Sequence, residues 1–322
     1  MSELITAGEP LVLFIADEKG ALSEVKHYSR YMAGADVNVS VGVARLGHSV
    51  TFLSEVGTDP FGKIILDFLK RENVNTHHVL TTSEWPSGFM LKGLSDNGRP
   101  ETAYFRKGSA TSRLTKDSID TIDFSGAKIL HLGGILAGLS ETAYRTTLAL
   151  IGKARDNGLT ITFDPNLRPV IWDSEEEMIR RTNEIAYLCD VVAPNVKEGR
   201  TLTGETEKEK MADFFLKKGV KQVIINLVDS GSYTKKSLSD GTYSETLVPN
   251  FNTNKVVDRV GAGDGFVAGV VSAMLENLSD RDVLLRGNAI GSIQMQNLGD
   301  NDGLPTRDQL ESFISKTQLA VR

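Results

Sequence analysis

The sequence predicts an α/β protein built on a doubly wound, mostly parallel sheet with helices on both faces. Three observations support this prediction. Short apolar segments alternate with longer segments of helical periodicity through most of the 322 residues. Polar, glycine-containing motifs follow the ends of apolar segments, where open α/β sheets bind their ligands. The composition, with 40% hydrophobic and 24% charged residues, is that of an ordinary globular domain. We therefore expect a single domain over residues 1–322.

Charge and cysteine content narrow the class of function. The net charge of −6 and the pI of about 5.5 argue against nucleic acid or an anionic membrane surface as the main partner. Cys189 is the single cysteine, so no internal disulfide can form, which fits a reducing compartment. The N-terminus lacks a signal-peptide pattern, and no apolar run is long enough to cross a bilayer. We expect a cytoplasmic protein that acts on small molecules.

The first third of the chain contains two segments that are typical of β-ribbons. Residues 11–32 include a turn at 18–20, and residues 87–107 include an Asp-Asn-Gly turn at 96–98, a good hairpin signal. The two segments form either a small sheet outside the main sheet or an edge hairpin of it. The apolar run Leu11 to Phe14, if exposed, indicates a dimer contact. Around these segments we expect strands at 4–6 and 50–56 and helices at 37–46 and 61–73.

The rest of the chain alternates regularly between strand and helix patterns. Such alternation predicts parallel strands joined by right-handed crossovers. The expected strands are 129–132, 159–163, 191–193 and 222–227. The expected helices are 140–157, 175–188, 197–203, 208–219, 262–277, 280–297 and 306–317.

One glycine turn carries the strongest chemical signal. Gly261-Ala262-Gly263-Asp264 follows the apolar pair Val256-Val257 and opens a helix. Glycines allow a ligand to approach the main chain closely, and the N-terminus of a helix favours an anion. Asp264 adds a proton acceptor beside that anion position, an arrangement that suits phosphoryl transfer. The alternative is an Asp that only caps its helix.

A second motif gives the glycine turn a family. The stretch from Ala33 to Ser40, which reads Ala-Gly-Ala-Asp-Val-Asn-Val-Ser, is followed by glycines at 47 and 57. Together the two motifs resemble the signatures of the ribokinase-like (PfkB) carbohydrate kinases. The resemblance implies a sugar kinase that uses ATP and Mg²⁺, with a small-sheet lid over the sugar that often carries a dimer contact. It implies Asp264 as general base, main-chain donors from Gly261, Ala262 and Gly263 for the migrating phosphoryl group, and sugar contacts from Gly34 and Asn38.

The substrate clue lies in Tyr104, Arg106 and Arg168. These residues and their surroundings resemble the 2-keto-3-deoxygluconate kinases. A guanidinium pairs with a carboxylate through two hydrogen bonds, so two arginines suit a sugar acid better than fructose or ribose. Each arginine has an alternative as a surface charge, and Arg168 could serve the nucleotide phosphates instead. A fructokinase or another neutral-sugar kinase of the family is the second interpretation.

The family resemblance also assigns a nucleotide side. Asn195 and Glu198 match an N-x-x-E motif linked to magnesium and phosphate, with the ion held through water. A requirement for K⁺ remains open. The other residues implied on the nucleotide side are Asn166, Arg168, Gly231, Gly261, Gly263 and Asn288.

Three positions depart from the family pattern, all of them on the nucleotide side. Asn226 and Val228 stand where a lysine and a glycine are usual, and Arg259 replaces a small residue. Val228 places a Cβ where the backbone should approach the nucleotide. Arg259 either supplies a compensating charge or points to solvent. A sugar-acid-binding protein with little kinase activity is therefore the alternative from another class.

Overall fold

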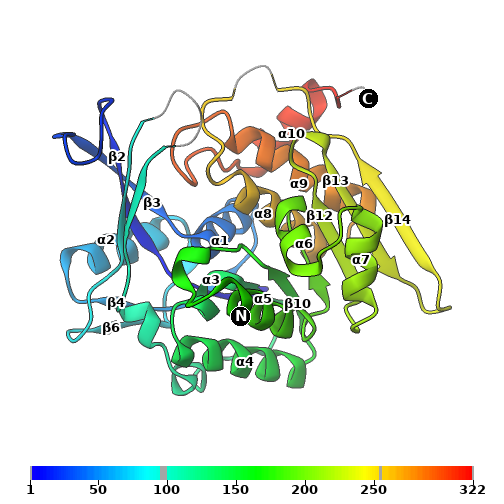
Figure 1. Ribbon diagram of the computed structural model, residues 1–322, viewed down its shortest axis with the longest axis horizontal. Helices are drawn as coiled ribbons and strands as arrows, with labels where there is room; N and C mark the ends of the chain where they lie inside the picture. Colours follow the sequence, from blue (N-terminus) through cyan, green and yellow to red (C-terminus); the bar gives the residue numbers. More distant parts are fainter. Residues whose placement is uncertain (1, 95–99, 254–255, 321–322) are drawn as a thin grey trace.

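The computed structural model describes residues 2–94, 100–253 and 256–320 and has the expected α/β architecture, with helices on both sides of a large sheet (Figure 1). In the described part of the chain this sheet has ten strands in the order β14-β13-β12-β11-β10-β9-β1-β4-β5, with β6 beside β4. The strands are β1 (Leu4–Ala7), β4 (Val50–Gly57), β5 (Val74–Asn75), β6 (Val79–Thr82), β9 (Ile129–Gly133), β10 (Thr160–Asp164), β11 (Val191–Val192), β12 (Gln222–Asn226), β13 (Ser232–Ser237) and β14 (Tyr243–Val248).

Helices follow most of these strands and return the chain across the sheet. The predicted helices are all present, with ends shifted by a few residues. They are α1 (Ala35–Arg45), α2 (Pro60–Arg71), α4 (Glu141–Asp156), α5 (Glu175–Ala186), α6 (Val196–Thr203), α7 (Lys208–Leu216), α8 (Ala262–Leu275), α9 (Asp280–Gln294) and α10 (Arg307–Lys316), together with the short α3 (Gly134–Gly138). Short 3-10 turns lie at Ala110–Arg113, Lys116–Ile119, Pro169–Ile171 and Val228–Ser230. Across the described residues, no helix has the length and apolar character needed to cross a membrane.

Two apolar cores, one on each face, hold the main sheet between its helices. Leu4 packs into the core that α1, α8 and α9 cover, whereas its neighbour Ile5 packs into the core under α4, α5 and α7. Phe52 and Leu53 divide in the same way because successive strand residues point to opposite faces. Burial on both faces explains why these strands read as continuous apolar runs.

The hairpin β13–β14 was not predicted. It pairs antiparallel with β12 and ends the sheet on one side (Figure 1). Its outer strand, Tyr-Ser-Glu-Thr-Leu-Val, is largely polar and exposed. A strand at the edge of a sheet pairs with only one other strand and often carries polar side chains, so its apolar pattern is weak.

The two ribbon segments form a separate four-stranded sheet, so the interpretation as an edge hairpin is wrong. Its order is β3 (Tyr28–Ala33), β2 (Leu11–Ala16), β7 (Phe89–Lys92) and β8 (Thr102–Phe105). Strands β7 and β8 pair antiparallel as a hairpin, whereas the turn predicted at 96–98 lies outside the described residues. In Figure 1 this sheet lies on the flank of the molecule opposite β14.

The expectation of an exposed apolar ribbon at Leu11 to Phe14 is also wrong. Leu11, Val12 and Leu13 are at most 3% exposed, and Phe14 is half-buried. The ring of Phe14 packs edge-on against Phe61 of α2, with ring centroids 5.8 Å apart. Val12 and Phe14 therefore attach the small sheet to the main domain, whereas Leu11 and Leu13 pack with other residues of the small sheet in a core of its own.

Candidate active site

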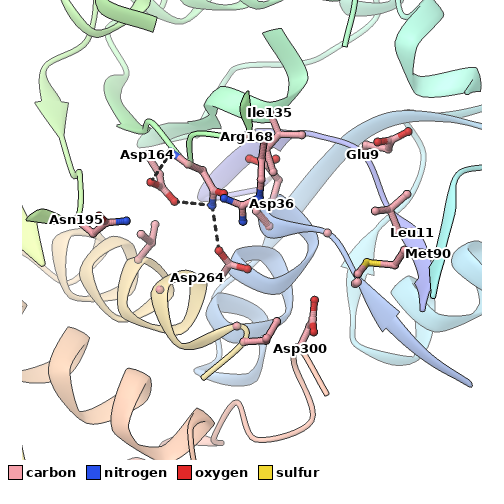
Figure 2. A pocket seen from close by; sticks show the side chains of 18 of the residues that line it. Glu9, Leu11, Asp36, Met90, Ile135, Asp164, Arg168, Asn195, Asp264 and Asp300 are labelled. Atoms are coloured by element: carbon pink, nitrogen blue, oxygen red, sulfur yellow. Dashed lines mark hydrogen bonds between the residues drawn. The ribbon is translucent and has the colours of Figure 1, made fainter. Parts of the chain in front are cut away.

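A cavity of about 370 Å³ lies where the carboxyl ends of the parallel strands meet the small sheet. Polar residues reach it from the ends of β10 and β11, from the first turns of α1 and α8, and from β7 and β8 of the small sheet. Figure 2 shows Asp36, Asp164, Asp264 and Asp300 converging on this cavity from separate elements. The position at the carboxyl edge of the sheet is the one predicted from the sequence.

The glycine turn places Asp264 at the floor of the cavity. Gly261 precedes α8 with φ of 77°, and a Cβ there would lie 2.1 Å from the carbonyl oxygen of Asp300, so only glycine fits. The main chain can therefore pass close to the 300–304 loop before the helix begins. Gly261 and Gly263 both line the cavity, which leaves the first N–H groups of α8 accessible to an anion.

Two amides orient the carboxylate of Asp264. Asn38 Nδ2 donates to Oδ2 at 2.7 Å, and Asn166 Nδ2 donates to Oδ1 at 3.1 Å. The pKa of Asp264 is raised because burial disfavours its charge, against the opposing effects of Asn38, Arg168 and Asn166. Desolvation therefore makes this carboxylate a stronger base than an exposed aspartate.

The structure places Asn38 behind Asp264 and not on the cavity wall. The residue is 1% exposed, and its Oδ1 accepts from Asn301 Nδ2 at 2.9 Å. Both ends of this amide are thus committed to protein groups. Gly34, by contrast, lines the cavity, with φ of 122° and a would-be Cβ only 2.5 Å from the Glu9 carbonyl.

The substrate residues Tyr104, Arg106 and Arg168 all line the cavity. Arg106, however, is already paired: its Nε donates to Glu9 Oε2 at 2.5 Å, and its Nη2 contacts the same oxygen. Glu9 is buried, and its pKa is raised by desolvation in spite of Arg106. A guanidinium has five donors, and no described residue accepts a hydrogen bond from Nη1, so the donors there are open to a ligand. The Tyr104 ring lies 5.8 Å from the Arg106 guanidinium.

Sequence reasoning missed two acids of the cavity, Asp36 and Asp300. Burial, and then the charge of Asp264, raises the pKa of Asp36 to about 7, although the Gly133 N–H donates to it at 2.8 Å. Burial also raises the pKa of Asp300 to about 7, and its Oδ1 has no hydrogen-bond partner among the described residues. Asp36 lies inside the first motif, which was a usable signal. Asp300 comes from a C-terminal loop with no such signal.

The missed cation is Lys92 of β7. It is 3% exposed, and its Nζ lies 2.5 Å from Asp258 Oδ2 and 4.0 Å from Asp300 Oδ1. Asp258 immediately precedes the Arg259–Gly263 turn. This ion pair therefore ties the small sheet to the glycine turn.

The N-x-x-E motif forms a helix cap whose carboxylate faces the cavity. Asn195 Oδ1 accepts from the N–H groups of Lys197 and Glu198, and Glu198 accepts from the N–H groups of Asn195 and Leu167. Desolvation raises the pKa of Glu198 and of its neighbour Asp164. In the described part of the chain no group of three or more His, Cys, Asp or Glu side chains is arranged to hold a metal. A Mg²⁺ ion that keeps most of its waters fits this motif, since it needs few protein ligands.

A second cavity, of about 200 Å³, adjoins the first beside α9. Asn288 lines it and holds the β14 end through bonds of 3.2 Å to the carbonyls of Val248 and Pro249. Gly287 and Gly291 also line it, and they let α9 approach α8 closely: a Cβ at Gly287 would lie 2.8 Å from the Phe266 ring, and one at Gly291 3.0 Å from the Ala262 carbonyl oxygen. Gly231 does not line it: with φ of 100° it makes a turn whose Cβ would be 2.1 Å from the Val248 carbonyl.

Val228 and Arg259, two of the three residues that differ from the family pattern, line this second cavity. Val228 adopts φ of 57°, the left-handed region that glycine usually occupies, so the backbone keeps a glycine-like path. Its side chain is 45% exposed. Arg259 Nη1 lies 2.9 Å from Asp229 Oδ1.

Comparisons with known proteins agree with this geometry. The model of the "pfkB family carbohydrate kinase" matches residues 1–307. The chain is 42% identical to a 2-dehydro-3-deoxygluconokinase of Bacillus subtilis (strain 168), over 97% of this chain and 95% of the relative. A PfkB protein from Polaromonas sp. JS666 superposes with a TM-score of 0.86, at 35% identity, covering 97% of this chain and all of that one. A fructokinase from Vibrio cholerae O395, solved with fructose, ADP and potassium ion, has a TM-score of 0.84 at 25% identity, over 98% of each chain.

Proposed function

This chain belongs to the pfkB family of carbohydrate kinases, and from that membership we propose that it transfers the γ-phosphoryl group of ATP to a hydroxyl of 2-keto-3-deoxygluconate. The observation that carries the proposal is the relative named as a 2-dehydro-3-deoxygluconokinase, another name for the same activity, at 42% identity over nearly the whole of both chains. The cavity is consistent with it, since Arg106 and Arg168 line the same space as Asp264.

In the proposed reaction the acceptor hydroxyl lies against Asp264, which takes its proton as the phosphoryl group arrives. Asn38 and Asn166 hold the carboxylate in place. The N–H groups of Gly261, Ala262 and Gly263 bind the oxygens of the migrating group at the N-terminus of α8, where the helix dipole favours negative charge. Mg²⁺ supplies further charge neutralisation of the phosphates, with Asn195 and Glu198 as its outer-shell residues.

The sugar acid is proposed to lie between the small sheet and α1. Tyr104 and Arg106 contact it from the small sheet, Gly34 from the start of α1, and Arg168 from the loop after β10. Donors at Arg106 Nη1 and on Arg168 face a ligand carboxylate in this arrangement. A neutral sugar leaves those donors unmatched, and the Vibrio cholerae fructokinase is less similar than the Bacillus subtilis relative.

The nucleotide is proposed to lie in the second cavity, with its ring beside Asn288 and its phosphates toward Gly263. Asn166, Arg168, Asn195 and Gly231 complete this side, the last by shaping the turn. The glycine-like backbone of Val228 favours a working nucleotide site over a sugar-acid-binding protein without kinase activity. The potassium ion in the fructokinase structure motivates an assay in K⁺ and in tetramethylammonium.

The small sheet is proposed to act as a lid, with segments 11–32 and 87–107, and to carry a homodimer contact. The buried run at Leu11 to Phe14 is not the contact surface. We place the contact surface instead on the two outer strands of the small sheet, where Phe105 of β8 is 49% exposed and Tyr28 of β3 is half-buried. Light scattering on the wild type and on Phe105→Glu tests this: the variant should be monomeric.

A coupled assay over a panel of sugars and sugar acids tests the function. We expect the highest kcat/KM with 2-keto-3-deoxygluconate. Calorimetry of Mg-ATP, with and without that sugar acid, separates kinase from binding protein. Heat with the sugar acid but none with the nucleotide would favour the binding protein, and a preference for fructose would favour the neutral-sugar kinase.

A further inference from the structure

The two cavities share part of one wall, and Arg259 belongs to it. Asn195, Asn226, Gly263 and Phe266 are the other residues that line both. If the acceptor occupies the first cavity and the base of the donor the second, the donor's phosphates must cross this shared wall. Arg259 is the cation at that crossing.

Two other cations of the first cavity are held by buried partners, and the third, Arg168, follows β10 and is proposed to serve both the sugar acid and the nucleotide. Lys92 contacts Asp258, and Arg106 contacts Glu9, both pairs being largely buried. Arg259 differs: it is paired with Asp229, and the two side chains are 51% and 77% exposed. An exposed ion pair contributes little to stability, so a phosphate can displace Asp229 from it.

The loop opposite Arg259 gives the phosphates no positive charge of its own. Residues 226–231 read Asn-Leu-Val-Asp-Ser-Gly, with one acid and no base. Asn226 Oδ1 already accepts the Val228 N–H at 2.8 Å. Asp229 at this place repels a polyphosphate unless a cation screens it.

We propose that Arg259 binds the phosphates of the nucleotide donor by exchanging its partner Asp229 for phosphate oxygens. The inference rests on the proposed kinase function and adds a phosphate-binding residue to it. A guanidinium can offer two parallel donors to a phosphate, and it keeps its charge at any physiological pH. Asp229 then acts as a competitor of the nucleotide, holding Arg259 until the phosphates arrive.

Opposite effects of the two partners test the exchange. Calorimetry would measure the binding of ADP, adenosine and 2-keto-3-deoxygluconate to the wild type, Arg259→Gln and Asp229→Asn. Arg259→Gln should weaken the binding of ADP by about 10–100-fold, the effect of losing a charged hydrogen bond. It should leave the affinities for adenosine and the sugar acid within about twofold of the wild type, because neither ligand reaches the phosphate position. Asp229→Asn should strengthen the binding of ADP by about 1.5–5-fold, since it removes the competitor.

A purely structural ion pair predicts a different result, because its two single variants should then behave alike. Equal weakening of ADP by both variants, or equal weakening of ADP and adenosine by Arg259→Gln, would overturn the inference. Arg259→Lys is the matched control: it keeps the charge without the fork and should bind ADP between the wild type and Arg259→Gln. A wild type that binds the sugar acid but no ADP overturns the kinase proposal as well, whereas unchanged ADP binding by an Arg259→Gln enzyme overturns only the inference.

Discussion

Replacing Asp264 with asparagine tests the proposed chemistry most directly. The substitution keeps the size of the side chain and removes its ability to accept the proton of the substrate hydroxyl. General-base catalysis contributes about 10²–10⁴-fold to a rate. We therefore expect kcat to fall by that factor, which corresponds to about 3–5 kcal/mol of transition-state stabilisation. Binding of the sugar acid should change by less than about tenfold, because a single hydrogen bond to it is altered.

The stability of the same variant gives an independent check on the environment of Asp264. The pKa of this group is raised in the folded protein, so its contribution to stability is complete below its unfolded pKa and is lost as the pH rises through the folded value. Asparagine has no such loss. The free energy of unfolding of Asp264→Asn, relative to the wild type, should therefore increase from pH 4 to pH 8 in urea titrations.

Two outcomes would refute this reasoning. A kcat of Asp264→Asn within tenfold of the wild type, with the fold intact, would remove the general base. A relative stability that falls with rising pH would mean that Asn38 and Asn166 outweigh desolvation at this site. Asp264→Ala serves as a second variant, since it removes both amide contacts and should lower kcat at least as far.

Three further predictions concern neighbouring positions. Arg106→Ala should raise the KM for the sugar acid by about 10–100-fold and cost about 3–5 kcal/mol of stability by leaving Glu9 buried alone; adding Glu9→Gln should restore stability but not KM, and an unchanged KM in both would contradict the carboxylate contact. Val228→Gly should raise the free energy of unfolding by about 1 kcal/mol in denaturant titrations because it relieves a left-handed valine, whereas an equal gain from Val228→Ala would disprove that cause. Asp36, with a pKa of about 7, is neutral below that pH and charged above it, where it repels the carboxylate of the sugar acid. The KM for the sugar acid should therefore rise from pH 6 to pH 8 in the wild type but less in Asp36→Asn. Parallel pH profiles of the two proteins would exclude Asp36 as the cause.

Several features of the fold could be predicted because their signals are local. The alternation of apolar runs and helical periods indicates a two-faced sheet, since each strand and helix must bury its own residues. The glycines before α8 likewise indicate a close main-chain approach. The hairpin β13–β14 escaped prediction because a polar edge strand buries too little to leave an apolar pattern.

The fold class, the family and the place of Asp264 at the start of a helix could all be inferred from the sequence, because motifs and periodicity lie within short stretches of chain. The partners of these residues became known from the folded chain alone. Glu9 neutralises Arg106 from 97 residues away, Asn38 supports Asp264 from 226 residues away, and Asp300 reaches the cavity from a C-terminal loop. Pairings of this kind depend on how distant segments meet, and the charge and burial that they set have no counterpart in the local sequence.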